Sequence, residues 1–352
     1  MQTVTVPVSS PYEVRVGFGL LDHAGEDIRR AAGGSIAAIV TDDNVGPLYA
    51  ARLRDSLEKA GYRVAMFQFE HGERSKTLET YGAILGFLAD SGLTRRDVVV
   101  ALGGGVAGDL AGFAAATYQR GVHLVQLPTT LLSATDSSVG GKTGVDLPQG
   151  KNLAGAFHQP CLVLCDCALM DSLPDDVFTD GCAEVIKYGL IADELFFDSL
   201  RRPVRGQLEQ AVARCVAIKS AVVCADERER GERQLLNYGH TVGHAIEQCS
   251  GFSVSHGRAV AIGMAIMARA AWRSGWCDRA CAEQTQQMLQ SHGLPIVCRF
   301  SAEELGRAAR ADKKRTGDDI TIVVPEKIGK CVLKSLPMAQ LKHLIEMGED
   351  VL

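Results

Sequence analysis

The sequence predicts an α/β protein with an N-terminal parallel-sheet domain and a C-terminal, mainly α-helical domain. In the first half, short apolar runs alternate with stretches whose apolar residues recur at helical spacing, a pattern typical of a parallel sheet covered by helices. After Pro174, helical spacing dominates. The 352 residues suffice for two domains of about 100 to 200 residues each. We therefore expect domains at 1–174 and 175–352.

The expected elements follow from the period of the apolar residues. Five strands are predicted, at Ser35–Val40, Tyr62–Phe69, Asp97–Leu102, His123–Leu127 and Leu162–Cys165. Three helices are predicted between them, at Pro47–Ala60, Ser75–Asp90 and Val106–Thr117. The second domain is expected to be helical from Asp180 to about Leu294, with stops at glycines 206, 231, 251 and 293. Two late strands, Ile320–Val324 and Cys331–Leu333, should pair with each other or cover a sheet edge.

Composition excludes several classes of function. A hydrophobic share of 46% indicates a globular protein, and a net charge of −5 offers no basic field for nucleic acid. The amino terminus lacks the pattern of a secretion signal, and no run of 18 apolar residues is present. We expect a cytoplasmic protein without a nucleic-acid or membrane partner. The eleven cysteines are scattered along the chain, which favours reduced thiols in the core over a disulfide framework. Cys161, Cys165 and Cys167 are close in sequence, but we expect them too to be core thiols rather than zinc ligands.

A glycine turn follows the strand that ends at Leu102. Gly103, Gly105 and Gly108 satisfy G-x-G-x-x-G, in which glycines and a helix amino terminus can approach a pyrophosphate. The match is weak by itself, because no acidic residue ends the next strand. Asp42 and Asn44 end an earlier strand and could bind a ribose there. The alternative is that this segment caps the predicted helix that begins at Pro47.

The segment 128–152 concentrates hydroxyl groups, small residues and two lysines, Lys142 and Lys151. We predict a loop between a strand and a helix that contacts a polar ligand. Gly-Gly-Lys-Thr at 140–143 is similar to the end of a P-loop, but that motif requires glycine where Asp136 stands. A nucleoside-triphosphatase is therefore not indicated.

The segment from Arg233 to Glu247 is predicted to form one helix with a polar stripe. Residues 233, 237, 240 and 244 share its face, and His240 and His244 are one turn apart. Either histidine could be structural. Glu184 together with His240 and His256 would offer two imidazoles and one oxygen, as catalytic metal sites do. The alternative for Glu184 is a surface ion pair with Lys187, one helical turn away.

Together, these motifs resemble the 3-dehydroquinate synthase family from about Thr41 to Pro325. The most specific segments are Pro128–Asn152, Gly181–Gly189 and Asp226–Glu247. The resemblance implies a Rossmann-like nucleotide domain and a helical metal- and substrate-binding domain. It also implies conversion of 3-deoxy-D-arabino-heptulosonate 7-phosphate to 3-dehydroquinate and phosphate, with NAD and a divalent metal, zinc or cobalt.

The resemblance assigns site residues one by one. The implied metal ligands are Glu184, His240 and His256. The implied NAD contacts are Asp42, Asn44, Glu73, Lys76, Gly103, Gly104, Gly105, Asp109, Thr129, Thr130, Leu132, Lys142 and Lys151. The implied substrate contacts are Asp136, Lys142, Asn152, Lys187, Lys219, Arg233, Asn237, His244 and one of the two neighbouring lysines, Lys313 or Lys314. Of these two lysines, we name Lys314 as the candidate.

Arg120 matches an arginine that reaches the neighbouring subunit's phosphate site in the family, which implies a homodimer. The chain departs from the family in one place: the segment between Glu184 and His240 is several residues short, near 203–206.

Three alternatives remain open at this point. Cyclases that make 2-deoxy-scyllo-inosose or an epi-valiolone use substrates without a carboxylate, so Arg233 with Asn237 favours dehydroquinate formation. An alcohol or glycerol dehydrogenase would release NADH, whereas Lys142, Lys151 and Asn152 favour a phosphorylated substrate. A non-catalytic metal- or nucleotide-binding protein is disfavoured, because the expected catalytic residue types are all retained.

Overall fold

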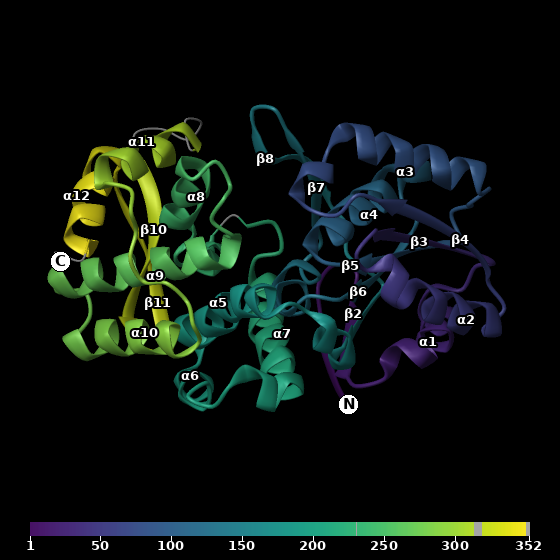
Figure 1. Ribbon diagram of the computed structural model, residues 1–352, viewed down its shortest axis with the longest axis horizontal. Helices are drawn as coiled ribbons and strands as arrows, with labels where there is room; N and C mark the ends of the chain where they lie inside the picture. Colours follow the sequence, from purple (N-terminus) through teal and green to yellow (C-terminus); the bar gives the residue numbers. More distant parts are fainter. Residues whose placement is uncertain (230, 313–318, 350–352) are drawn as a thin grey trace. The chain divides into compact units, whose positions relative to one another are not determined.

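The computed structural model describes residues 1–229, 231–312 and 319–349 (Figure 1). The chain divides into two units. The first comprises Met1–Leu173 and Leu208–Glu227, and the second comprises Pro174–Gln207 and Arg228–Leu352. The domains expected from the sequence, 1–174 and 175–352, are contiguous, whereas 208–227 belongs to the first of these units.

The first unit is built on a seven-stranded sheet in the order β1-β2-β9-β6-β5-β3-β4. Only the pairing of β1 with β2 is antiparallel among the pairs of this sheet. The strands are β1 Gln2–Val6, β2 Tyr12–Gly17, β3 Ile36–Asp42, β4 Arg63–Phe69, β5 Val98–Gly103, β6 His123–Pro128 and β9 Leu162–Asp166. All five strands predicted from the sequence are present, which confirms the parallel sheet.

Helices cover both faces of this sheet, because alternate residues of its central strands feed two separate cores. Val98, Val100 and Leu102 pack with α1 (Ala24–Ala32) and α2 (Ala51–Lys59). Val99 and Ala101 pack on the other face with α3 (Leu78–Asp90) and α4 (Gly105–Thr117). Short helical turns lie at Leu20–His23, Gly46–Ala50, Glu73–Ser75, Tyr118–Arg120, Ser133–Ser137 and Cys167–Ser172.

Helix α7 (Leu208–Ala225) belongs to the first unit because it contacts β1, β2 and the turn Ser133–Ser137. Its buried face includes Val212, Val216 and Lys219. The Ser220 hydroxyl also donates to the Thr5 carbonyl. Helical periodicity identifies such a segment as a helix but carries no information on which unit receives its apolar face.

The segment after β6 differs from the predicted loop. The π-helical turn Ser133–Ser137 is followed by an antiparallel hairpin, β7 (Lys142–Leu147) with β8 (Gly150–Phe157). Gly144 lies opposite Gly155 in this hairpin. A Cβ at Gly155 would lie 2.1 Å from the Thr143 carbonyl oxygen, so the close pairing requires glycine.

The second unit consists of helices around α9, with one hairpin. Helix α9 (His256–Arg273) contacts α5, α8, α10 and α12, and its residues 259–271 are all buried. The other elements are α5 Asp175–Ala192, α6 Glu194–Ser199, α8 His240–Cys249, α10 Arg279–Ser291, α11 Ala302–Asp312 and α12 Met338–Gly348, with 3₁₀ turns at Val204–Gln207 and Glu232–Asn237. Strands β10 (Asp319–Lys327) and β11 (Lys330–Pro337) pair with each other, as predicted.

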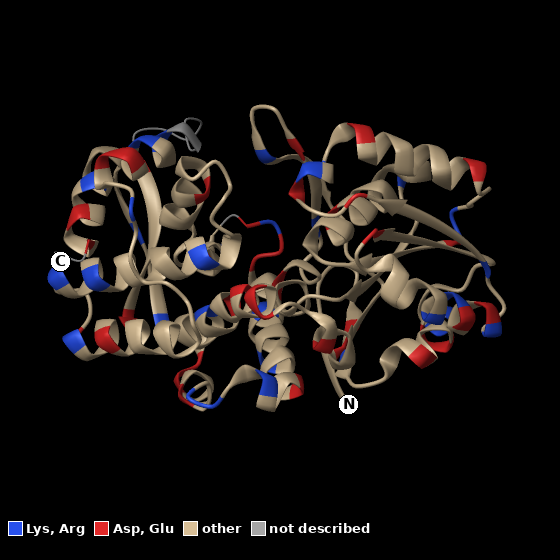
Figure 2. Ribbon diagram, viewed as in Figure 1, with Lys and Arg blue, Asp and Glu red and all other residues tan. Residues whose placement is uncertain are grey.

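Several surface and core properties follow from the composition. Both units carry Lys and Arg as well as Asp and Glu (Figure 2), in line with the small net charge. Among the described helices, none has the length and apolar character needed to span a bilayer. All eleven cysteines are free thiols. Cys165 is fully buried in β9, and burial raises the pKa of the nearby Cys161 thiol to about 11. Both side chains are therefore protonated thiols, as expected for core residues.

Candidate metal and dinucleotide sites

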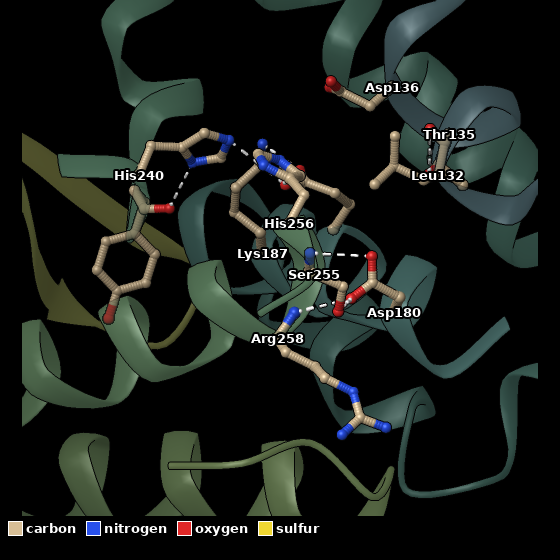
Figure 3. A network of polar contacts seen from close by, with 12 residues as sticks. Leu132, Thr135, Asp136, Asp180, Lys187, His240, Ser255, His256 and Arg258 are labelled. Atoms are coloured by element: carbon tan, nitrogen blue, oxygen red, sulfur yellow. Dashed lines mark hydrogen bonds and ion pairs between the residues drawn. The ribbon is translucent and has the colours of Figure 1, made fainter. Parts of the chain in front are cut away.

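Three possible metal ligands converge in the second unit, one from each of α5, α8 and α9. The Nε2 atoms of His240 and His256 lie 3.5 and 3.6 Å from Glu184 Oε1. Their ring centroids are 5.3 Å apart, and Glu184 is only 1% exposed. A carboxylate withdrawn from water requires a compensating positive charge. Lys187, one turn along α5, supplies one through an ion pair with Glu184 Oε2. Figure 3 labels Lys187 together with His240 and His256.

Glu184 therefore lies in a buried cluster with His240 and His256, which is the first of the two arrangements that the sequence suggested for it. Lys187 is also 1% exposed, so the alternative of a surface ion pair between Glu184 and Lys187 is wrong. Two imidazole nitrogens and one carboxylate oxygen within reach of one point form a donor set suited to zinc or cobalt.

A glycine breaks the helix that the sequence predicted from Arg233 to Glu247. The chain forms a 3₁₀ turn over Glu232–Asn237 and then passes through Gly239, whose φ is +80°. A Cβ at Gly239 would lie 2.7 Å from the Val260 carbonyl oxygen. The single continuous helix is thus wrong, and His240 instead begins α8.

Within α8, the predicted spacing of the two histidines holds. The ring centroids of His240 and His244 are 5.5 Å apart, and His244 is exposed. Arg233 is 1% exposed on the preceding turn, and Asn237 Nδ2 donates to Glu229 Oε1 over 3.2 Å. The four polar residues therefore come from two elements rather than from one helical stripe.

Protonation differs between the two histidines of the cluster. Burial, aided by the Lys187 charge, lowers the pKa of His240 to about 3, so its imidazole is neutral and able to coordinate a cation. Burial acts in the same direction on His256, but hydrogen bonds and charges from Glu184 and Glu247 outweigh it and raise that pKa to about 10. A cation held by His256 would take the place of its proton.

Two residues that the sequence analysis did not assign support His256. Glu247 Oε2 accepts from His256 Nδ1 at 3.2 Å. Asp180 accepts from the backbone N–H groups of Gly257 and Arg258 at the start of α9. Glu247 was part of the recognised motif without a role. No local signal marked Asp180, because it lies 76 residues before His256 in the sequence.

In the first unit, the glycine turn and the acidic strand end meet at the carboxyl edge of the sheet. Strands β3 and β5 are neighbours, and Asp42 Oδ2 lies 3.4 Å from the Cβ position of Gly103. Helix α4 begins at Gly105, with Gly104 at its N-cap. Asp42 Oδ1 accepts from the backbone N–H groups of Asn44 and Val45 and so closes a local turn. The helical turn that follows, Gly46–Ala50, has Val45 at its N-cap and no side-chain cap, so the capping alternative for Asp42 is wrong.

A second group of predicted residues is joined by Lys76, which is 4% exposed. Its ammonium group contacts Asp109 Oδ2 at 2.6 Å and Asn152 Oδ1. Asn152, at φ +55° on β8, also donates its backbone N–H to Asp146. Lys151 Nζ lies 3.6 Å from Glu73. Lys76, Asp109 and Asn152, predicted partly as NAD contacts and partly as substrate contacts, are thus joined by direct contacts, and the predicted residues Lys151 and Glu73 form a separate pair.

Asp136 and Lys219 form the third group of the first unit. Lys219 Nζ on α7 donates to the carbonyl and to Oδ1 of Asp136 at 2.7 and 2.8 Å.

Thr129 is buried at the end of β6, and its hydroxyl has no hydrogen-bond partner among the described residues. Thr130 bonds to Ser133.

The remaining predicted residues are placed as follows. Leu132 precedes the turn Ser133–Ser137, Lys142 is exposed at the start of β7, and Arg120 is exposed at φ +66°. Lys313 and Lys314 lie outside the described residues.

A parallel α/β unit with a glycine turn at its sheet edge, together with a helical unit that carries a Glu-His-His cluster, fits the class of NAD- and metal-dependent sugar-phosphate cyclases. Family models identify the member of this class. Residues 66–180 match the N-terminal part of 3-dehydroquinate synthase, and residues 181–315 match its C-terminal part. The chain belongs to the 3-dehydroquinate synthase family.

Curated relatives agree over nearly the whole chain. It is 44% identical to the 3-dehydroquinate synthase of Caulobacter vibrioides (strain NA1000 / CB15N) over an alignment 365 positions long, gaps included, which covers 98% of this chain and 99% of that one. It is 42% identical to that of Geobacter sp. (strain M21), with 96% of each chain covered. The family and activity implied by the sequence motifs are thus confirmed, and the protein is an NAD- and metal-dependent enzyme.

Solved structures confirm the fold. A 2-deoxy-scyllo-inosose synthase complexed with carbaglucose-6-phosphate, NAD⁺ and Co²⁺ superposes with a TM-score of 0.88 at 26% identity, covering 98% of this chain and 99% of that one. A 2-epi-5-epi-valiolone synthase from Streptomyces hygroscopicus with NAD⁺ and Zn²⁺ gives 0.84 at 26% identity, with 96% of each chain covered. A glycerol dehydrogenase from Schizosaccharomyces pombe, at 16% identity and 0.65, shares the fold.

Proposed function

We propose that the protein converts 3-deoxy-D-arabino-heptulosonate 7-phosphate to 3-dehydroquinate and phosphate, a step of the shikimate pathway towards chorismate and the aromatic amino acids. The supporting observation is the buried Glu184 carboxylate beside His240 and His256, in a chain 42% identical to such synthases over nearly its full length. The sequence of steps would be transient oxidation at C5, phosphate elimination, re-reduction, ring opening and an intramolecular aldol reaction.

Glu184, His240 and His256 would hold the divalent metal, zinc or cobalt. Each histidine directs Nε2 towards Glu184 and has its Nδ1 hydrogen-bonded elsewhere, which suits coordination through Nε2. A bound metal would supply Lewis-acid polarisation of a substrate oxygen. The chain's own contribution is a rigid set of three donors from the starts of two helices and from the buried face of a third.

The nicotinamide cofactor would bind at the carboxyl edge of the first unit's sheet, where it would accept and return a hydride. Support comes from the amino terminus of α4 beside Gly103 and Asp42, since free N–H groups there favour a pyrophosphate. The proposed contacts are Asp42, Asn44, Glu73, Lys76, Gly103, Gly104, Gly105, Asp109, Thr129, Thr130, Leu132, Lys142 and Lys151.

The proposed substrate contacts use charge and orientation. Arg233 and Lys219 would bind the substrate carboxylate, because a guanidinium can form two parallel hydrogen bonds with it. The phosphate would be bound by Lys142, Asn152, His244 and Arg120, with Asp136, Lys187 and Asn237 completing the set. Lys219 is oriented by Asp136, and prior orientation of this kind lowers the entropic cost of reaching the reactive geometry.

Two finer features belong to the same proposal. A homodimer would let Arg120 reach a partner's phosphate site, and sedimentation of the purified protein tests it: a monomer at working concentration contradicts it. A cytoplasmic location is proposed from the sequence and is tested by fractionating cells that express the tagged protein.

The activity is tested with purified protein, the heptulosonate phosphate, catalytic NAD, and zinc or cobalt. We expect phosphate and 3-dehydroquinate to be released in equal amounts, because each substrate molecule loses one phosphate. NAD should be needed only in catalytic amounts, because the hydride is returned in each cycle. Phosphate release and product identity are followed together. Phosphate without dehydroquinate would indicate a sibling cyclase, and net accumulation of NADH would indicate a dehydrogenase; either contradicts the proposal.

A further inference from the structure

We propose that Glu247 is a positioning residue for the metal site, holding the His256 ring so that Nε2 faces Glu184. This inference rests on the proposed metal ligands Glu184, His240 and His256. Glu247 lies in the last turn of α8, two residues before its end at Cys249, and is 5% exposed. Its Oε2 lies 3.2 Å from His256 Nδ1, while His256 Nε2 lies 3.6 Å from Glu184 Oε1. The two carboxylates therefore contact opposite nitrogens of one ring.

The chemistry of the acceptor fixes the tautomer of the ring. An ionised carboxylate can only accept a hydrogen bond, so the contact with Glu247 places a proton on His256 Nδ1. In the neutral imidazole, Nε2 is then the nitrogen with a lone pair for a cation. His240 is arranged in the same way with a weaker partner, because its Nδ1 lies 3.1 Å from the Tyr238 carbonyl oxygen. Of the two rings, only that of His256 has a charged acceptor at Nδ1. This charge increases the basicity of Nε2 as a ligand.

The backbone under His256 is fixed separately from its ring. Asp180 accepts from the N–H groups of Gly257 and Arg258 at 3.0 and 2.9 Å and from the Ser255 hydroxyl (Figure 3). These bonds fix the first turn of α9 but leave rotation about the His256 side-chain bonds free. Glu247 removes that freedom, so the two carboxylates have separate tasks.

Close packing of α8 on α9 brings Glu247 to the ring. A Cβ at Gly263 would lie 2.1 Å from the Gly239 carbonyl oxygen, and one at Gly243 would lie 3.1 Å from Val260 N. Glycine at these positions lets the two helices approach closely. The Glu247 side chain on α8 is therefore long enough to reach the His256 ring on α9.

A competing arrangement uses the same carboxylate differently. His244, Glu247 and His256 also offer donor atoms within 4.8 Å of one another, so Glu247 could itself be a ligand of a cation on the Nδ1 side of the ring. The observed Nδ1 contact with Glu247 favours the orienting role, and the two roles predict different behaviour for a glutamine at this position.

The test measures the metal affinity of the full-length protein by competition between zinc and a chromophoric chelator. Glu247→Leu removes the acceptor at similar size, and we expect a loss of affinity of about 10- to 100-fold. Glu247→Gln keeps an oxygen that accepts from Nδ1, so it should recover most of the affinity and retain the cobalt d–d spectrum of the wild type. Glu303→Gln, at an exposed position on α11, is the matched control and should bind zinc normally.

Two results would overturn the proposal: wild-type affinity in Glu247→Leu, or a Glu247→Gln protein as weak as the leucine variant, which would identify Glu247 as a ligand. A measurement without any variant covers the case of poor folding. In zinc-loaded, ¹⁵N-histidine-labelled protein, His256 should carry its proton on Nδ1, and a proton on Nε2 overturns the proposal. Failure of the ligand set itself is distinguishable, because Glu184→Ala would then leave zinc binding intact.

Discussion

At the scale of single residues, the Glu184 cluster gives the most direct prediction. His240→Ala removes one of three donors and leaves two, so we expect purified protein to lose bound metal and turnover. The fold should persist, because His240 is neutral at pH 7 with its pKa lowered to about 3 by burial, and alanine suits the start of a helix. Metal content per chain and circular dichroism are the measurements, with exposed His343→Ala as the control. Full metal stoichiometry in His240→Ala would contradict the ligand assignment.

Candidate site residues could be named from the sequence, whereas their partners could not. The family resemblance selected Glu184, His240 and His256 as candidate ligands, and the structure brings their donor atoms together. The contact of Lys219 with Asp136 joins residues 83 positions apart, and that of Lys76 with Asn152 joins residues 76 apart. Such pairs depend on how helices pack, which local sequence does not determine. The same reason explains why Asp180 received no role before the structure.

At the scale of elements, regular periodicity was predictable and interruptions were not. The alternation of β3, α2, β4, α3 and β5 follows from apolar spacing, which is local. The hairpin of β7 and β8 and the break at Gly239 depend on backbones that approach too closely for a side chain. A glycine in a sequence does not show whether it is required by a turn, a contact or neither.

Gly257 at the start of α9 allows a test of such a contact. A Cβ there would lie 1.9 Å from the Asp180 carbonyl oxygen. Gly257→Ala should therefore displace the first turn of α9, lowering stability by about 1–3 kcal/mol and weakening zinc binding through His256. Gly86→Ala on α3 is the control, because no atom lies near its Cβ position; it should stabilise the protein by about 0.5–1 kcal/mol. Denaturant unfolding measures both variants, and an unchanged midpoint in Gly257→Ala would show that α9 adapts without cost.

At the scale of the whole molecule, the two-unit organisation was predictable in number but not in connection. Helical spacing continues through 208–227, yet this helix packs against β1 and β2 of the first unit. The chain therefore passes from one unit to the other three times, near 174, 208 and 228. A contiguous boundary was expected because the spacing of apolar residues changes only once along the sequence, after Pro174.

This organisation predicts that the two cofactors stabilise different parts of the chain. A ligand that binds only the folded state at 100 times its Kd adds about 2.7 kcal/mol, and the gain should appear where the ligand binds. In hydrogen-exchange mass spectrometry, zinc should slow exchange in α5, α8 and the start of α9, whereas NAD should slow it at the ends of β3 and β5 and the start of α4. His240→Ala should lose the zinc effect and keep the NAD effect, because its substitution lies in the second unit. Protection by zinc in the first unit alone would contradict the metal assignment, and protection by NAD in the second unit alone would contradict the cofactor assignment.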